Sequence, residues 1–247
     1  MILRFRNFAL AALLCLAPPV AKAEGLADSY NSSVELTIKG QSEALTNFPL
    51  LVRISEAQLP GFKYDADNTS SDKLAFVAED GTALDYDVDT WNTSGESTIW
   101  VKIPELPTDG TTITMCWALK GKTAPVVYNP TNVWSDYAGV WHMTDDSAAT
   151  ANAPKANKGK YTDVEDNGFI GSALKATQDS EPILLVDTDE QIDSLTNSSF
   201  TVTFWSYLNS ESNGTSNQYL FSRRRVHNEN GYAVYLNSRA PDRKSVV

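Results

Sequence analysis

The chain has 247 residues, with 20 Lys and Arg against 31 Asp and Glu, and its formal net charge is -11. This acidic balance excludes the nucleic-acid-binding class, which needs a basic surface. With 42% hydrophobic and 21% charged residues, the composition is that of a folded globular protein, not of a disordered tail. Two Cys and two His are too few for a zinc site or a disulfide framework.

Residues 1–23 have the pattern of a secretory signal peptide. Arg4 and Arg6 give a positive start, an apolar run follows at 8–17, and Ala-Lys-Ala at 21–23 supplies small residues for cleavage. A retained membrane anchor is the alternative, but the apolar run is shorter than the about 20 residues that span a bilayer. We therefore predict export through the inner membrane, to the periplasm, the cell surface or the medium.

Cleavage after Ala23 removes three basic residues and no acidic one, which leaves 17 basic against 31 acidic residues and a net charge of -14. The mature chain keeps Cys116 as its single cysteine, so no intramolecular disulfide can form. Cys116 lies in an alternating apolar run and is predicted to be a small buried hydrophobic residue. No stretch of eighteen apolar residues occurs after residue 23, so no membrane span is expected between residues 24 and 247.

The first half of the mature chain alternates apolar and polar residues with a period of two, which predicts half-buried strands. Acidic-Gly and Pro-containing turns separate these runs. The predicted strands are 34–38, 48–54, 74–78, 84–88, 99–103 and 113–119, the last with Ile113, Met115, Trp117 and Leu119 on one face. Six short strands without an amphipathic helix indicate a β-sandwich over residues 24–123.

Residues 124–133 contain two prolines and are predicted to be a linker, so a second domain would cover residues 134–247. A polar stretch at 144–160 predicts a long loop. Further strands are predicted at 183–186, 199–208, 219–222 and 231–236. The predicted fold class is thus all-β, with two consecutive sandwiches.

Four segments of the second half occur in the order typical of one family: VWHM at 140–143, GFIGSAL at 168–174, SFTVTFW at 199–205 and GYAVYL at 231–236. This half resembles a concanavalin A-like lectin domain of the laminin-G type. The resemblance implies a jelly roll in which Trp141, Phe204 and Trp205 are packing or rim residues. A jelly roll has about eight strands and this half offers about five, so we expect the domain to be incomplete.

Residues 47–121 resemble a bacterial domain of unknown function that precedes laminin-G-like domains. The matching segments are NFPLLVRI, DKLAFVAEDGTALDYDVDTW, STIWVKIPEL and TITMCWALKG. Some members of that family continue into a proton channel of the TolQ/ExbB/MotA type, and others are surface proteins. The channel alternative would place membrane helices beyond Val247.

No catalytic motif is found, and we expect no enzyme. The paired-carboxylate strand motif of the glucanases with this fold is absent, and neither histidine accompanies a Gly-x-Ser-x-Gly elbow. The acidic clusters in polar, turn-like contexts are expected to be solvated: Glu165 with Asp166, and Asp187, Asp189 and Glu190. A polysaccharide hydrolase whose catalytic strands lie elsewhere is the least favoured reading.

Calcium is the cofactor that an acidic surface would suit, because hard cations take carboxylate and carbonyl oxygens. The candidate ligands are Asp145 with Asp146, and Asp187 with Asp189, although the EF-hand spacing is absent and solvated loops are favoured.

A stripe of Asp85, Asp87 and Asp89 alternates with apolar residues and is predicted to be the wet face of a sheet, which could also meet a basic partner.

Sugar binding needs exposed aromatic rings beside polar groups. Trp100 points away from its apolar neighbours and Trp91 lies at a strand end, so these are the candidates, with core packing as the alternative for both. The basic cluster of Arg223, Arg224 and Arg225 could hold an anionic glycan. The leading hypothesis is an exported, non-catalytic binding or adhesion module of the bacterial cell envelope, with a glycan or surface protein as its partner.

Overall fold

The computed structural model describes residues 25–65, 67, 69–121, 128–143, 156–165, 168–176, 184–186, 199–207, 218–223 and 232–236. The predicted signal peptide lies outside these residues. The described chain is built from strands, so the expected all-β class is confirmed. It divides into two compact units, residues 1–187 and 188–247. The division into these units does not test the predicted domain boundary near residue 133, which stays a prediction.

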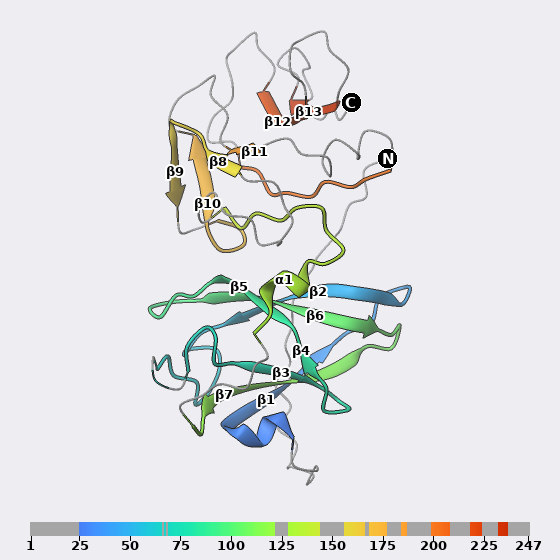
Figure 1. Cartoon of the computed structure of the whole chain (residues 1–247), viewed down its shortest axis with the longest axis vertical. Coiled ribbons are helices and arrows are strands. Elements are labelled where there is room, and N and C mark those ends of the chain that lie inside the picture. Colours follow the sequence, from blue (N-terminus) through green and yellow to red (C-terminus); the bar gives the residue numbers. More distant parts are fainter. Residues whose placement is uncertain are drawn as a thin grey trace. The chain divides into compact units, whose positions relative to one another are not determined.

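Seven strands form a sandwich of two antiparallel sheets (Figure 1). One sheet has the order β1-β7-β3-β4, and the other has the order β2-β6-β5. The strands are β1 (Tyr30–Ile38), β2 (Leu45–Ile54), β3 (Ala75–Ala78), β4 (Ala83–Leu84), β5 (Tyr86–Thr90), β6 (Ser97–Leu106) and β7 (Thr111–Leu119). Five of the six predicted strands of the first half form, because the period of two is a local property of the sequence. The predicted strand at 84–88 is instead divided between β4 and β5, which belong to different sheets.

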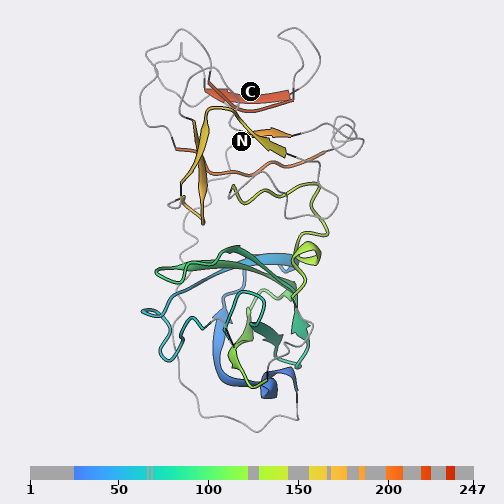
Figure 2. The ribbon, with the colours of Figure 1, turned by 60° about the vertical axis from the view of Figure 1, so that its left-hand side comes forward.

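The core lies between these two sheets, which face each other as layers in both views (Figure 2). Phe76 of β3 and Tyr86 of β5 are fully buried there, together with Ile99 and Val101 of β6. Alternate residues of β6 point inward, so Trp100 is left on the outer face, as its alternation predicts.

A smaller apolar cluster lies on the other face of the four-stranded sheet, beneath the 3-10 turn η1 (Leu26–Ser29). Cys116 is fully buried in it, which confirms its prediction as a buried hydrophobic residue. Leu119 also packs there, which corrects the expectation that it shares a face with Met115 and Trp117. Ala118 has a φ of 58°, outside the extended region, so the alternation shifts at that residue.

The remaining elements are short. They are α1 (Pro130–Val133), β8 (Ala156–Lys158), β9 (Thr162–Glu165), β10 (Ala173–Ala176), β11 (Leu184–Val186), β12 (Gln218–Arg223) and β13 (Tyr232–Leu236). They pair as β9 with β10, β8 with β11 and β12 with β13. Two expectations need correction: β8 falls inside the predicted loop, and residues 199–207 are not in a strand. These residues form no ladder with another described strand, and β propensity alone does not make one.

Candidate functional site

The outer face of the β2-β6-β5 sheet carries an unusual concentration of polar and aromatic groups. In β5, Tyr86 packs in the core and Val88 packs in part against it, so the alternation of side chains directs Asp87 and Asp89 outward. The register pairs Asp87 with Trp100 of β6, which brings one carboxylate and one indole side by side. The indole N–H of Trp100 donates a hydrogen bond to Asp89 Oδ2 at 3.1 Å.

Residues 128–143 cover this face. Pro130 begins the short helix α1, where its missing N–H costs nothing, and α1 packs against β5. Val133 and Trp134 are buried, although 124–133 was predicted as a linker. The Trp134 ring meets Trp100 edge-on at 5.3 Å between centroids, and its N–H donates to Asp87 Oδ2 at 2.7 Å. This segment, residues 128–143, is called the latch below.

Polar contacts at the rim hold the same segment. The Lys102 ammonium of β6 donates to the carbonyl oxygen of Asn132 at 3.0 Å and to Ser135 Oγ at 2.8 Å. Asn132 in turn donates through its side-chain amide to Asp85. Asn47 of β2 donates to Asp136 at 2.8 Å. All three strands of the sheet therefore contact residues of the latch.

His142 lies at the centre of the contact. Its Nε2 is 2.7 Å from Asp87 Oδ2, and its Nδ1 is 2.9 Å from Asp89 Oδ2. The three side chains are 13%, 7% and 4% exposed, so both carboxylates are buried. The prediction of a wet acidic face is therefore wrong at Asp87 and Asp89. A chain segment that lies far away in the sequence covers them and supplies the positive charge that buried carboxylates need.

The electrostatics of the cluster favour its charged form. Burial works against a charged imidazole, but its hydrogen bonds to Asp87 and Asp89 and their negative charges outweigh this effect and raise the pKa of His142 to about 9. Burial also opposes ionisation of Asp89, yet the His142 contact, with hydrogen bonds from Trp100 and Thr90, lowers the pKa of that carboxyl. At neutral pH the cluster is an imidazolium held between carboxylates.

This arrangement suits binding of a segment better than catalysis. A histidine that acts as a general base needs one ring nitrogen free for the proton that it removes. Both nitrogens of His142 face carboxylate oxygens, and two tryptophan N–H groups donate to those same carboxylates. The hydroxyl of Thr90 donates to Asp89 Oδ1 at 3.1 Å, not to the imidazole.

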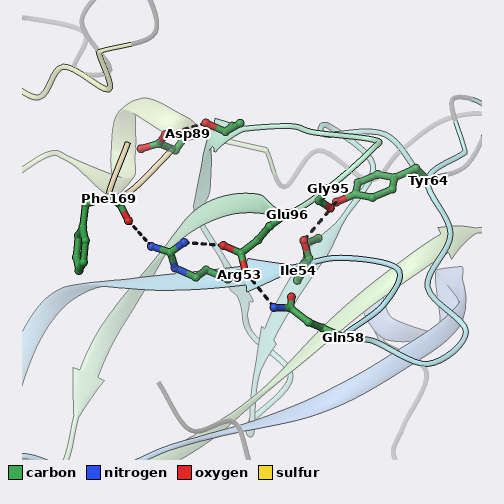
Figure 3. Close-up of polar contacts among 9 residues, drawn as sticks. Arg53, Ile54, Gln58, Tyr64, Asp89, Gly95, Glu96 and Phe169 are labelled. Carbon is green, nitrogen blue, oxygen red and sulfur yellow. Dashed lines mark hydrogen bonds and ion pairs between the residues drawn. The ribbon is translucent and has the colours of Figure 1, made fainter. Parts of the chain in front are cut away.

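A second segment borders the same cluster. The Gly-Phe-Ile-Gly turn at 168–171 closes with a 2.9 Å hydrogen bond from Gly168 N–H to the Gly171 carbonyl oxygen. Arg53 of β2 reaches between Glu96 and the carbonyl oxygen of Phe169, to which it donates at 2.7 Å (Figure 3). A Cβ on Gly171 would lie 2.0 Å from Asp89 Oδ1, so only glycine permits this approach.

The predicted sugar-binding tryptophans both contact other side chains of the sandwich. The indole N–H of Trp100 donates to Asp89, and its ring packs against the ring of Trp134. Trp91 meets Tyr64 edge-on at 5.0 Å and packs in part against the core. Each remains partly accessible, and sugar stacking by either one stays a prediction.

The other predicted site residues fall outside the described part of the chain. This applies to the candidate calcium ligands Asp145, Asp146, Asp187 and Asp189, and to Arg224 and Arg225. Arg223 ends β12, but its side chain is not described. Among the described residues, no group of three or more His, Cys, Asp or Glu side chains is arranged to hold a metal ion.

Sequence reasoning missed the cluster itself. His142 was assigned to the VWHM segment and the aspartates to a wet face. His142 lies 55 residues after Asp87 and 53 residues after Asp89 in the chain. The available signal was the coincidence of an outward acidic pair with a histidine flanked by aromatic residues. That signal has no fixed spacing, because the contact is made by tertiary packing.

Part of the chain that includes this cluster matches a known protein family. Residues 70–151 match the family described as Domain of unknown function (DUF2341). The matched range contains Asp87 and Asp89 as well as Trp134 and His142, so it includes both sides of the cluster. No curated protein and no solved structure matches the chain. Within the described ranges, no helix has the length and apolar character needed to cross a membrane.

Proposed function

We propose that the chain is an exported, non-catalytic binding or adhesion module of the bacterial cell envelope. In this proposal its second half, which resembles a laminin-G-type lectin domain, recognises a glycan or a surface protein. The family of residues 70–151 has no known function, so the proposal rests on side-chain chemistry and on the sequence resemblance.

One observation carries the recognition step: aromatic side chains are exposed along residues 199–207. Phe200 and Phe204 are 38% and 40% exposed, Trp205 is 69% exposed and Tyr207 is 86% exposed. The resemblance implied that Phe204 and Trp205 are packing or rim residues, and their exposure is higher than core packing requires. Hydroxyl-bearing residues flank these rings in the sequence, and rings beside hydroxyl groups are suited to sugars and to protein surfaces.

The non-catalytic part of the proposal is supported by the His142 cluster. Among the described residues, this is the place where histidine and carboxylates meet, and both imidazole nitrogens are occupied there. A buried imidazolium held by two carboxylates has no proton-accepting nitrogen to offer to a substrate.

The test is a glycan-array screen of the mature chain, followed by titration of each hit with a Tyr207→Ala variant. We expect affinity to fall up to about tenfold, since an aromatic contact contributes about 0.5–1.5 kcal/mol. Phe169→Ala is the matched control, because Phe169 is 64% exposed and lies in the other compact unit. Unchanged affinity in Tyr207→Ala would remove Tyr207 from the site, and the Trp100→Ala variant would then test the outer face of the sandwich.

A further inference from the structure

We propose that the latch, residues 128–143, is held on the outer face of the β2-β6-β5 sheet by the positive charge of His142, and that loss of this charge releases the latch while the sandwich stays folded. The released state would expose a face of tryptophan and carboxylate groups that the docked latch covers. This device is independent of any ligand bound by residues 199–207.

The His142 ring must donate two hydrogen bonds to hold both carboxylates. Both ring nitrogens face a carboxylate oxygen, at 2.7 Å and 2.9 Å, and only the doubly protonated ring can donate to both. A neutral ring would place one unprotonated nitrogen against a carboxylate oxygen, so an attraction becomes a repulsion. Because the three side chains are nearly buried, water cannot screen this change.

Both aspartates keep hydrogen-bond partners when the latch leaves. Asp89 keeps the hydrogen bonds from Trp100 and Thr90, which belong to the sandwich itself. Asp87 loses both His142 and Trp134, and it regains water on an open sheet face. The sandwich can therefore tolerate the separation without leaving an unsatisfied buried carboxylate.

The core of the sandwich is formed without the latch. The main apolar core draws its described members from residues 34–118 and includes no residue of the latch. The latch buries Val133 and Trp134 against the outer face instead. Tyr128, the first residue of the latch, meets the core residue Tyr86 at 5.1 Å between ring centroids. Release of the latch after Tyr128 would therefore expose the contact of Val133 and Trp134 and would leave the packing between the two sheets intact.

Other charged and titratable groups face the same region from each neighbouring element. They are Asp85, Asp87 and Asp89 on and before β5, Lys102 on β6, Arg53 on β2, and Tyr128, Asp136 and Tyr137 on the latch. Burial, followed by nearby carboxylates, raises the pKa of both Tyr128 and Tyr137 above its usual value. The tyrosines therefore stay neutral over the range in which His142 loses its proton.

The test is hydrogen exchange of the mature chain, read by mass spectrometry for the latch and for β6 and β7 separately. In the wild type we expect protection of the latch to fall at least tenfold between pH 7 and pH 10, after correction for the intrinsic exchange rate. A His142→Gln variant should show the unprotected latch already at pH 7. In both cases β6 and β7 should keep their protection.

A matched control is Lys63→Gln, which removes an exposed ion pair of the same sandwich with Glu56 and should leave the latch protected. Two results would overturn the proposal. Equal latch protection at pH 7 and pH 10 would show that the charge does not hold the segment. Joint loss of protection in the latch and in β6 would show that the two unfold as one unit. If His142→Gln does not fold, the wild-type pH series still decides between these outcomes.

Discussion

His142 is a cation buried against two carboxylates, and such clusters are costly to break. A buried charge that loses its partner keeps its desolvation penalty, so removal of one member destabilises more than the intact pair stabilises. Here the carboxylates also accept hydrogen bonds from Trp134 and Trp100, and these restrict the directions that they can face. The cluster thus selects one position for the imidazole and therefore for the latch.

The raised pKa of His142 predicts how stability depends on pH. The ring binds its proton more tightly in the folded state, with a pKa of about 9 against an ordinary 6.5. Its stabilising contribution is therefore complete below about pH 6.5 and is lost as the pH rises to about 9. We expect the free energy of unfolding to fall by up to about 3 kcal/mol over that range, measured by urea denaturation at each pH. His142→Gln should remove most of this slope, and an unchanged slope would assign the titration to another group.

Cys116 is predicted to be inert in the folded protein. It is fully buried, and burial, with a smaller effect of Asp28, raises the pKa of its thiol to about 11. Because the thiolate is the reactive form, iodoacetamide should modify native protein at pH 8 far more slowly than urea-unfolded protein. Mass spectrometry of the alkylated chain measures both rates. Comparable rates would mean that the cluster beneath η1 opens readily.

At the scale of elements, the sandwich depends on turns that the sequence marks clearly. The loop at 107–110 joins β6 to β7 and ends at Gly110, which has a φ of 93°. The N–H of Gly110 donates a hydrogen bond to the carbonyl oxygen of Pro107, which closes the turn. A Cβ there would lie 2.2 Å from the carbonyl oxygen of Ile38 in β1. The glycine thus permits both the turn and a close approach between neighbouring segments.

Gly110→Ala should therefore destabilise the sandwich. A non-glycine residue in that backbone region costs about 1–3 kcal/mol, and the contact with Ile38 adds to this cost. Thermal unfolding measures the change. Gly81→Ala separates the two causes, because Gly81 also has a positive φ but has open space around it, and Gly121→Ala is the neutral control. Equal losses at Gly110 and Gly81 would show that the close contact adds nothing.

For the whole molecule, the family match includes the latch as well as part of the sandwich. The family match at residues 70–151 spans β3 to β7, α1 and His142, so it covers both partners of the buried cluster. The resemblance that predicts a laminin-G-type second half also allows the alternative of a periplasmic region of a TolQ/ExbB/MotA-type channel protein. The two differ in the size and location of the native protein.

An antibody to residues 24–133 should therefore be used on fractionated source cells. A soluble band of about 25 kDa, judged by chain length, would support an exported binding module of this length. A larger band in the membrane fraction would favour the channel alternative over the proposed binding module. A larger soluble band would point to further binding modules.

Much of the first sandwich could be predicted from sequence, because the signals act locally. A period of two identifies the strands of the sandwich except for the break between β4 and β5, and it also places Trp100 and the aspartates on the outer face. The prediction failed where a distant segment intervened. Asp87 and Asp89 looked like solvated charges, since no local pattern indicates that residues 128–143 return to cover them. The prediction of a strand at residues 199–207 failed for the opposite reason. Their sequence is typical of a strand, but they pair with no other strand among the described residues.

The sequence by itself therefore determined the all-β class, the positions of the strands and the side of the sheet on which each side chain lies. These follow from backbone geometry, which depends on a few neighbouring residues. Only the tertiary structure decided that two outward carboxylates are buried and that an imidazolium lies between them. Burial and pKa depend on whatever packs against a residue, and here the partner lies more than fifty residues away in the chain.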